Sequence, residues 1–372
     1  MEKQARTQIG PTHLGMKRID RYIFKRYLST FLVMLFLFIP IGIMVDVAEK
    51  IDKFKEKEVP LGELFNYYID FTWYFANLLF PIFVFLAVIW FTSKLASNTE
   101  IIAILSSGIS FTRFLRPYLF AASCIAVITF FAGQFIIPKS NEGFNSFQYK
   151  YISKKQERET SELYKQINDN EFIYVSSFDP IRKRGTNFAL EHFEDSQLKF
   201  KIMSNSIRWI PRDSTFRLLQ YRKRIITGDE EKLIVLPRKD TVFDFKIEDL
   251  APEKYKAETL TFSELNTFIE KERQSGSRLI NAHLLVRHKR WSIPASAFVL
   301  TIIAVAMTSF KRRGGMGVNL ALGVALGFLF IFFDKIFGVL VLKANFSPAI
   351  AAWFPIILFG SLAVYLVNYA KR

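Results

Sequence analysis

The sequence predicts an α-helical membrane protein of six spans into which an antiparallel β-domain is inserted. Three observations support this fold class. Hydrophobic residues make up 51% of the 372 residues, and 40 residues are phenylalanine, which is typical of a membrane protein. Six apolar stretches are long enough for a helix rising about 1.5 Å per residue to cross about 30 Å of hydrocarbon. Between the third and fourth stretches, a long polar segment alternates in hydrophobicity as strands do.

The apolar stretches give the predicted boundaries of the spans. They run over residues 27–45, 71–92, 118–137, 291–310, 316–342 and 349–370. The first is longer than the apolar core of a secretory signal and no small-residue cleavage site follows it, so we expect it to remain in the mature chain. The chain is therefore divided into an N-terminal segment (1–26), spans one to three (27–138), an extramembrane domain (139–290) and spans four to six (291–372).

Lysine and arginine in the short flanking segments predict the orientation, because such residues are retained on the cytoplasmic side. The N-terminal segment carries seven, the loop after span two three, residues 311–315 three and the C-terminus two, whereas the opposite short loops carry four and one. The first set of segments therefore carries fifteen lysines and arginines and the opposite set five, which places both termini in the cytoplasm. Residues 139–290 then lie on the far side, since long domains are translocated largely regardless of their charge.

The extramembrane segment predicts an antiparallel β-domain between two helical connectors. From Glu171 to about Phe245, short alternating runs such as "EFIYVSSF" and "LKFKIMSNSIRWI" are separated by turn residues such as Gly228-Asp229. Residues 139–168 and 262–290 are the predicted helical connectors. Ser263 is the expected cap of an amphipathic helix in the second connector, with Leu265, Phe268 and Ile269 on its apolar side.

The loop "NTEIIAILSSGIS" between the second and third spans predicts a short amphipathic helix over residues 97–108. Ser97 and Glu100 have the spacing of a capping box, and Gly108 can end the helix in a left-handed cap. Ile101, Ile104 and Leu105 fall on one face. Two interpretations remain open at this point: the apolar face lies in the lipid interface while Glu100 only caps, or the helix docks into a cytoplasmic partner whose basic residue meets Glu100.

Catalytic chemistry has little support in the sequence. It contains no phosphate-binding loop, no serine-hydrolase elbow and no zinc-protease motif, and its single cysteine, Cys124, excludes an intrachain disulfide. The four histidines, His13, His192, His283 and His288, are scattered over separate segments. We therefore expect no catalytic residues, no metal site, no cofactor bound by this chain and no nucleic-acid partner.

Several long strings resemble the LptF/LptG (YjgP/YjgQ) permease family of the lipopolysaccharide exporter. They include "IDRYIFKRYLSTF", "FPIFVFLAVIWFTSKLASNTEIIAILSSGIS", "GGMGVNLALGVALGFLFIFFDKIFGVL" and "SPAIAAWFPIILF", and together they cover most of the chain. Within the family, "FDKIFG" resembles LptG more than LptF. The resemblance implies a bacterial inner-membrane protein with a jelly-roll-like periplasmic β-domain. It also implies that residues 97–108 form the coupling helix that receives the ATPase, through Glu100, Ile101, Ile104, Leu105 and Gly108.

The resemblance further implies a transport mechanism and its partners. Cytoplasmic LptB-like ATPase subunits would use ATP and Mg²⁺, and an LptF-like sister permease would complete a cavity for lipopolysaccharide. Lipid would enter from the outer leaflet through seams between the first and fifth spans. ATP-driven closure would push it towards an LptC- or LptA-like periplasmic bridge without breaking a bond.

Two groups of residues are predicted to lie along the lipid path. Asp46 stands where a basic residue of the LptG pattern is expected, so Lys50 and Lys53 could attract lipid phosphates; the alternative is a solvated loop, since acidic residues are interleaved with them. Phe31 and Met34 share one helical face lower in the same span. Asp334 and Lys335 lie near the far interface, where an interfacial or gate-lining role suits them better than proton transfer.

Two other classes of function remain as alternatives. A membrane scaffold that transmits movement in another ATPase-driven complex would also combine spans with an external domain. A membrane-embedded lipid-modifying enzyme would need convergent catalytic residues at the membrane face, and none stand out in the sequence.

Overall fold

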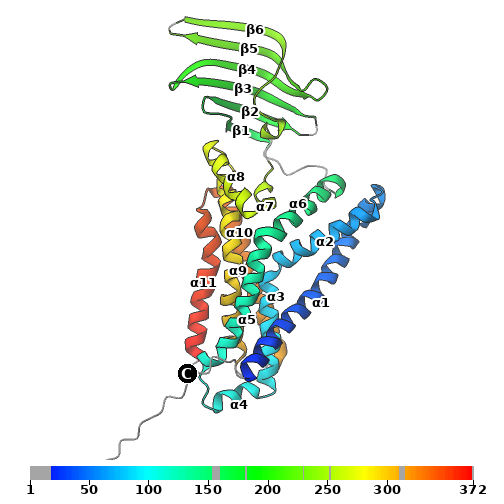
Figure 1. Cartoon of the computed structure of the whole chain (residues 1–372), viewed down its shortest axis with the longest axis vertical. Coiled ribbons are helices and arrows are strands. Elements are labelled where there is room, and N and C mark those ends of the chain that lie inside the picture. The colour runs from blue at the N-terminus through cyan, green and yellow to red at the C-terminus, as the bar shows by residue number, and fades with distance from the viewer. Residues whose placement is uncertain are drawn as a thin grey trace, which may run out of the picture.

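The computed structural model describes residues 18–152, 160–180, 182–228, 230–250, 253–309 and 315–370. A bundle of helices carries a single β-sheet at one end, and the short helix α4 (Glu100–Ser106) lies at the opposite end (Figure 1). The predicted N-terminal segment up to residue 17 and most of the basic loop 311–315 lie outside the described residues.

Six helical segments of the described chain are long and apolar enough to cross a membrane, as predicted. They are α1 (Arg18–Glu56), α3 (Phe80–Ser97), the continuous run Phe111–Ile152, α9 (Ile280–Thr308), α10 (Gly315–Ala344) and α11 (Pro348–Ala370). The last two agree closely with the predicted fifth and sixth spans. The first and fourth extend well beyond their apolar parts, because a helix does not have to end where it leaves the hydrocarbon.

The second predicted span, residues 71–92, is divided in the structure. Its first part belongs to α2 (Leu61–Leu78), which packs against α6 (Ile137–Phe147), and the rest belongs to α3. The break lies at Leu79, and Pro81 follows in the first turn of α3. Proline has no N–H to continue a helix but is well accommodated in a first turn, so the break has a local cause that an apolarity count cannot register.

The third span is part of a longer segment with two irregular turns. It consists of α5 (Phe111–Phe131), the π-turn η1 (Ala132–Ile136), α6 and a second π-turn η2 (Gln148–Ile152). The first π-turn ends two residues before Pro138, which cannot donate a backbone hydrogen bond. π-turns of this kind are frequent at functional sites, and η1 borders the cavity described below.

Helix α9 forms the centre of the bundle and packs against α3, α5 and α11. Small core side chains, such as Ala297 and Ala304, allow the helices to approach closely. Close packing is needed because lipid tails are as apolar as the side chains, so no hydrophobic force drives membrane helices together. Helix α10 approaches α3 in the same way: a Cβ atom added at Gly323 would lie 2.0 Å from Ile89 Cδ1. This glycine therefore packs against a helix of its own chain.

The β-domain is one six-stranded antiparallel sheet in sequential order. Its strands are β1 (Ser161–Gln166), β2 (Glu171–Asp179), β3 (Arg184–Glu194), β4 (Gln197–Ile210), β5 (Thr215–Thr227) and β6 (Glu230–Thr241). One face buries alternate residues such as Ile173, Phe188 and Leu218, and Phe245 and Leu250 from the segment after β6 cover it. Each described strand pairs with its sequence neighbours, so the sheet is a meander, without the crossing connections that define a jelly roll.

The two predicted connectors are correct only in part. Residues 161–166, expected to be helical, form β1, which pairs with β2. The prediction missed this strand because the alternation in "SELYKQ" is too short to recognise without its partner. The chain from the sheet returns through η3 (Ile247–Leu250) and α7 (Lys256–Thr259) to α8 (Phe262–Gln274). Helix α8 was predicted, but Thr261, not Ser263, forms its capping box with Glu264.

Candidate functional site

Helix α4 is held between the end of α3 and the start of α5, and the predicted capping box is wrong. Ser97 is the last residue of α3, and its hydroxyl donates to the Lys94 carbonyl at 2.9 Å. Thr99 is the actual N-cap of α4, with a φ of 61°. Glu100 instead accepts a hydrogen bond of 3.2 Å from the Asn98 side chain. The sequence spacing misled because α3 continues through Ser97 and leaves only a two-residue turn.

The end of α4 agrees with the prediction. Gly108 has a φ of +86°, and its N–H donates to the Leu105 carbonyl at 3.1 Å. This left-handed conformation suits glycine, which has no Cβ to clash with the preceding turn.

The apolar face of α4 packs onto the chain's own bundle. Ile101 is completely buried, and Ile104 and Leu105 are half-buried against the hydrophobic core of the helix bundle. Ile102, by contrast, is 50% exposed, and Ala103 and Ser106 are exposed beside it. The surface of α4 that is open to another molecule is therefore formed by Ile102, Ala103 and Ser106, with Glu100 half-buried at its edge. The sequence identified the apolar stripe but could not show which molecule it packs against.

An ion pair at the same end of the bundle was not anticipated from the sequence. Arg113, in the first turn of α5, donates two hydrogen bonds of 2.9 and 2.5 Å to the carboxylate of Asp20, in the first turn of α1. The two residues are 93 positions apart, so neither local charge pattern indicates the pair. The pair joins the foot of α1 to the helix that directly follows α4.

Lys50, predicted to attract lipid phosphates, is neutralised within the chain. Its ammonium group forms an ion pair with Asp46 and donates to the Tyr67 hydroxyl at 2.7 Å, and that hydroxyl donates to Asp46 at 3.0 Å. The network joins α1 to α2, and stacked rings such as Tyr67 and Phe147, with centroids 4.2 Å apart, surround it. Lys53 is exposed, and its ammonium group donates a hydrogen bond of 3.5 Å to the Ile152 carbonyl.

The two predicted positions lower in α1 face inwards. Met34 is 8% exposed and lies in the bundle core, and Phe31 is half-buried with its ring edge-on to Phe80. The outward face of α1 instead carries Phe36 and Met44, which are 79% and 70% exposed. The sequence could not distinguish the two faces because both are apolar.

Asp334 and Lys335 contribute to a cavity of about 350 Å³ enclosed by α2, α3, α5, α6, η1, α7, α9, α10 and α11. The Lys289 ammonium donates to the Asp334 carboxylate at 2.7 Å. Arg290, the next residue of α9, also lines the cavity. The structure thus brings the two predicted residues together with two cations that the sequence analysis did not single out.

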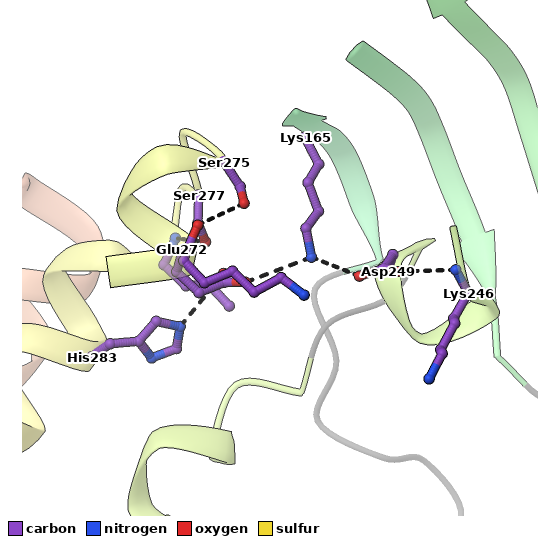
Figure 2. A network of polar contacts seen from close by, with 9 residues as sticks. Lys165, Lys246, Asp249, Glu272, Ser275, Ser277 and His283 are labelled. Atoms are coloured by element: carbon purple, nitrogen blue, oxygen red, sulfur yellow. Dashed lines mark hydrogen bonds and ion pairs between the residues drawn. The ribbon is translucent and has the colours of Figure 1, made fainter. Parts of the chain in front are cut away.

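A buried polar network joins the sheet to the membrane helices (Figure 2). Lys165 of β1 lies 2.8 Å from Asp249 and 3.5 Å from Glu272 of α8, and Glu272 lies 4.0 Å from His283 of α9. The Gln166 N–H also donates to the Ser275 carbonyl at 3.1 Å. Burial raises the pKa of Asp249, but the hydrogen bond and charge of Lys165 outweigh it, so the pKa lies below its ordinary value. The sequence does not reveal this network, because charged residues such as Lys165, Asp249 and Glu272 usually lie on the surface.

Comparison with known proteins gives the family. The sequence profile described as "Lipopolysaccharide export system permease LptF/LptG" matches residues 21–369. The chain belongs to the LptF/LptG permease family. It is similar to two curated proteins, the "Lipopolysaccharide export system permease protein LptG" of Escherichia coli strain K12 and of Escherichia coli O6:H1 strain CFT073. Each is 20% identical over 355 residues, which cover 94% of this chain and 97% of the relative.

Membership in the LptF/LptG family confirms the resemblance seen in the sequence. Both relatives carry the LptG name, in agreement with the similarity of "FDKIFG" to that subfamily. Six candidate membrane helices with an inserted antiparallel sheet match the architecture of the family. The chain is thus a multi-pass inner-membrane protein of a lipopolysaccharide export permease family.

Proposed function

We propose that this chain is the transmembrane permease subunit of an ATP-driven exporter that takes lipopolysaccharide from the outer leaflet of the inner membrane and passes it to a periplasmic bridge. The observation that carries the proposal is the position of α4 and the sheet at opposite ends of one six-span bundle (Figure 1). ATP hydrolysis by a partner bound at α4 can then drive movement of the helices at the opposite end of the bundle, where the sheet begins.

The exposed face of α4 is the proposed docking surface for a separate LptB-like ATPase, which binds ATP and Mg²⁺ itself. Ile102 and Ala103 supply apolar contacts, and Glu100 supplies a carboxylate for a basic residue of the partner. Two contacts of α4 support this proposal. Ile101 is buried and anchors α4 to the core of the bundle, and Gly108 ends α4 in a short turn that leads into α5. A push on α4 therefore reaches α5, and through Arg113 and Asp20 it reaches α1.

The proposed lipid path begins at two seams between this chain and an LptF-like sister permease. In each seam, the first span of one subunit faces the fifth span of the other; in this chain these spans are α1 and α10. The outward face of α1 and residues of α10 such as Phe328 and Phe332 are exposed and apolar, which suits them to acyl chains or to a partner helix. Lys53 can attract a lipid phosphate at the outer mouth, whereas Lys50 orients α1 against α2. The lipid is moved without breaking a bond.

The proposed orientation places α4 in the cytoplasm and the sheet in the periplasm. Strand β6 is then the edge of the sheet farthest from the membrane (Figure 1). Its residues Leu233 and Val235 are exposed. An open strand edge can pair with a strand of another protein, so β6 is the proposed contact for an LptC- or LptA-like bridge.

Reconstitution of the full complex in proteoliposomes containing lipopolysaccharide tests this function. With a photocrosslinker at Leu233, ATP should produce crosslinks to lipopolysaccharide, and ATP without Mg²⁺ should not. The same crosslinker at Ser106, an exposed residue of α4 at the opposite end of the bundle, is the control and should give no ATP-dependent crosslink to lipopolysaccharide. ATP-independent crosslinking, or capture of only bulk phospholipid, would contradict the proposal.

One observation favours a scaffold that transmits movement as the second candidate function. The buried network of Lys165, Glu272 and His283 couples α9 to the sheet and would serve force transmission without any lipid (Figure 2). Extraction in mild detergent separates the two functions, because the exporter should retain lipopolysaccharide together with its ATPase, and a scaffold should retain the ATPase alone.

A further inference from the structure

A row of arginines crosses the outer face of the β-sheet, which is the face opposite its buried core. Arg184 of β3 lies directly opposite Arg208 of β4, and Arg208 lies directly opposite Arg217 of β5. Directly opposed residues of an antiparallel pair share one face of the sheet, with Cα atoms about 4.5 to 5.5 Å apart. The neighbouring residues Ile207 and Leu218 are buried in the core of the sheet, so the three arginines lie on the outer face.

Only one of the three arginines in this row is neutralised. The Asp240 carboxylate of β6 accepts two hydrogen bonds of 2.9 Å from Arg217. Arg184 donates to the Ser206 hydroxyl at 2.9 Å, and neither Arg184 nor Arg208 forms an ion pair with any residue that the structure describes. Like charges directly opposite one another destabilise a sheet, so the pair Arg184 and Arg208 is unfavourable until an anion lies between the two guanidinium groups.

An open hollow of about 470 Å³ lies beside these two arginines, between the turn that joins β2 to β3 and the end of β4. The described residues that line it include four cations and no acid: Arg182, Lys183, Arg184, Arg208, Trp209 and Pro211. Asp179, which lies opposite Arg184 on β2, is 3.9 Å from the Arg182 guanidinium group. Lys183, Arg184 and Arg208 are all exposed, so the hollow presents three accessible cations that form no ion pair with the described residues.

A phosphate monoester matches these three cations better than a carboxylate does. It carries a charge of about −1.5 to −2 at pH 7 and three terminal oxygens that accept hydrogen bonds. A carboxylate has a single charge and two oxygens, so it neutralises less of the cluster. Guanidinium groups bind phosphate through charge-assisted and often bidentate hydrogen bonds. Since neighbouring strands lie about 4.8 Å apart, Arg184 and Arg208 can both contact the oxygens of one phosphate.

We propose that this hollow binds a phosphate monoester carried by a sugar of the transported lipid. Arg184 and Arg208 hold the phosphate oxygens, and Lys183 contributes the third positive charge. The assignment of a phosphate site depends on the sheet alone, whereas the lipid as the source of the phosphate rests on the proposed function. The row of arginines runs across β3, β4 and β5 towards β6, so a phosphate bound there holds the sugar part of the lipid beside the edge proposed for the bridge.

Isothermal titration of the purified full-length chain with glucose 1-phosphate tests the site. We expect glucose 1-phosphate to bind about tenfold more tightly than glucuronate, and Arg208→Gln to lower its affinity by about the same factor. Lys201→Gln should bind it as the wild-type chain does. This variant is the matched control, because Lys201 lies on the same strand and face, loses the same charge and is paired with Glu191 at 2.7 Å.

Hydrogen exchange separates loss of binding from loss of structure in Arg208→Gln. Glucose 1-phosphate should increase the protection of residues 182–184 and 208–210 in the wild-type chain and not in this variant. Without ligand, the variant should keep or gain protection in β4, because the substitution removes the repulsion between two opposed arginines. A structural role for Arg208 predicts the opposite, a loss of protection in the ligand-free variant.

A photocrosslinker at Pro211, an exposed residue that lines the hollow, identifies the source of the phosphate in the reconstituted complex. With ATP and Mg²⁺ it should capture lipopolysaccharide, and lipopolysaccharide treated with a phosphatase should be captured several-fold less. ATP-dependent capture at Leu233 but not at Pro211 would overturn the proposal and leave the proposed function intact. Capture at neither position, with tight binding of glucose 1-phosphate retained, would overturn the proposed function and assign the hollow to a free sugar phosphate.

Three further results would overturn the proposal. Equal affinity of the wild-type chain and Arg208→Gln for glucose 1-phosphate would refute the hollow as the site. Glucuronate binding as tightly as glucose 1-phosphate would refute the phosphate as the ligand. Capture of a periplasmic protein at Pro211 in place of lipid would assign the row of arginines to an acidic protein surface.

Discussion

Arg113 and Asp20 show how a single pair of side chains can link two helices at the α4 end of the bundle. The guanidinium group meets both carboxylate oxygens, which is the strongest arrangement such a pair can adopt. Because α5 follows α4 directly and α1 borders the proposed seam, we assign the pair a positioning role between the ATPase and the lipid path.

Arg113→Gln removes the bidentate contact and tests this role. We expect the free energy of unfolding to fall by about 1 to 2 kcal/mol, less than for a fully buried pair because the Arg113 side chain is 32% exposed. Lipid release per ATP hydrolysed should fall more than ATPase association does. The double variant Asp20→Arg with Arg113→Asp should recover part of the coupling; no recovery, or unchanged coupling in the single variant, would speak against the link.

Glu100→Lys reverses one charge at the edge of the exposed α4 face. We expect weaker ATPase association and loss of export with the spans still folded, because Thr99 and Gly108 set the ends of α4 without the Glu100 carboxylate. Ile102→Lys, on the same exposed face, should have a similar effect, and Arg116→Glu, a charge reversal in the next helix, is the control. Co-purification and export at wild-type levels for Glu100→Lys would remove this residue from the mechanism.

At the scale of elements, α1 has one face committed to the bundle and one face that is open. A photocrosslinker at Phe36 or Met44 should capture an acyl chain or the sister permease, because these side chains point out of the bundle. The same crosslinker at Met34 should capture α3 of its own chain. Identification of the products by mass spectrometry would contradict this division of faces if Met34 reached the partner and Phe36 did not.

The junction between β1, η3 and α8 should depend on pH through Asp249. Its pKa lies below the ordinary value of 3.8 when the chain is folded, so its ion pair with Lys165 stabilises the junction above pH 4 and this contribution is lost as the pH falls through the folded value. The protection of β1 amides against hydrogen exchange, measured relative to the intrinsic rate at each pH, should therefore fall below about pH 4. Asp249→Asn should show faster exchange already at pH 7 and a smaller pH response; an identical pH response would exclude Asp249 as the cause.

At the scale of the whole molecule, the proposed orientation puts the sheet and α4 on opposite sides of the membrane. A cysteine introduced at Leu233 should react with an impermeant maleimide from outside intact spheroplasts, and one introduced at Ser106 should react only after lysis, because both positions are exposed. The native Cys124, which is exposed on α5, is first replaced by alanine. Labelling of the Ser106 position from outside would reverse the orientation and contradict the proposed transport direction.

The sequence by itself determined the number of spans, the inserted β-domain, the left-handed end of α4 and the family. These follow from apolar length, alternation, a glycine at a position of positive φ and long matching strings, all of which are local along the chain. The tertiary structure alone decided which faces of α1 and α4 are open, the partners of Lys50 and Arg113, the division of the second span and the cavity around Arg290. In a membrane bundle both faces of a helix are apolar and ion pairs join residues far apart in sequence, so only the packing of the helices determines these features.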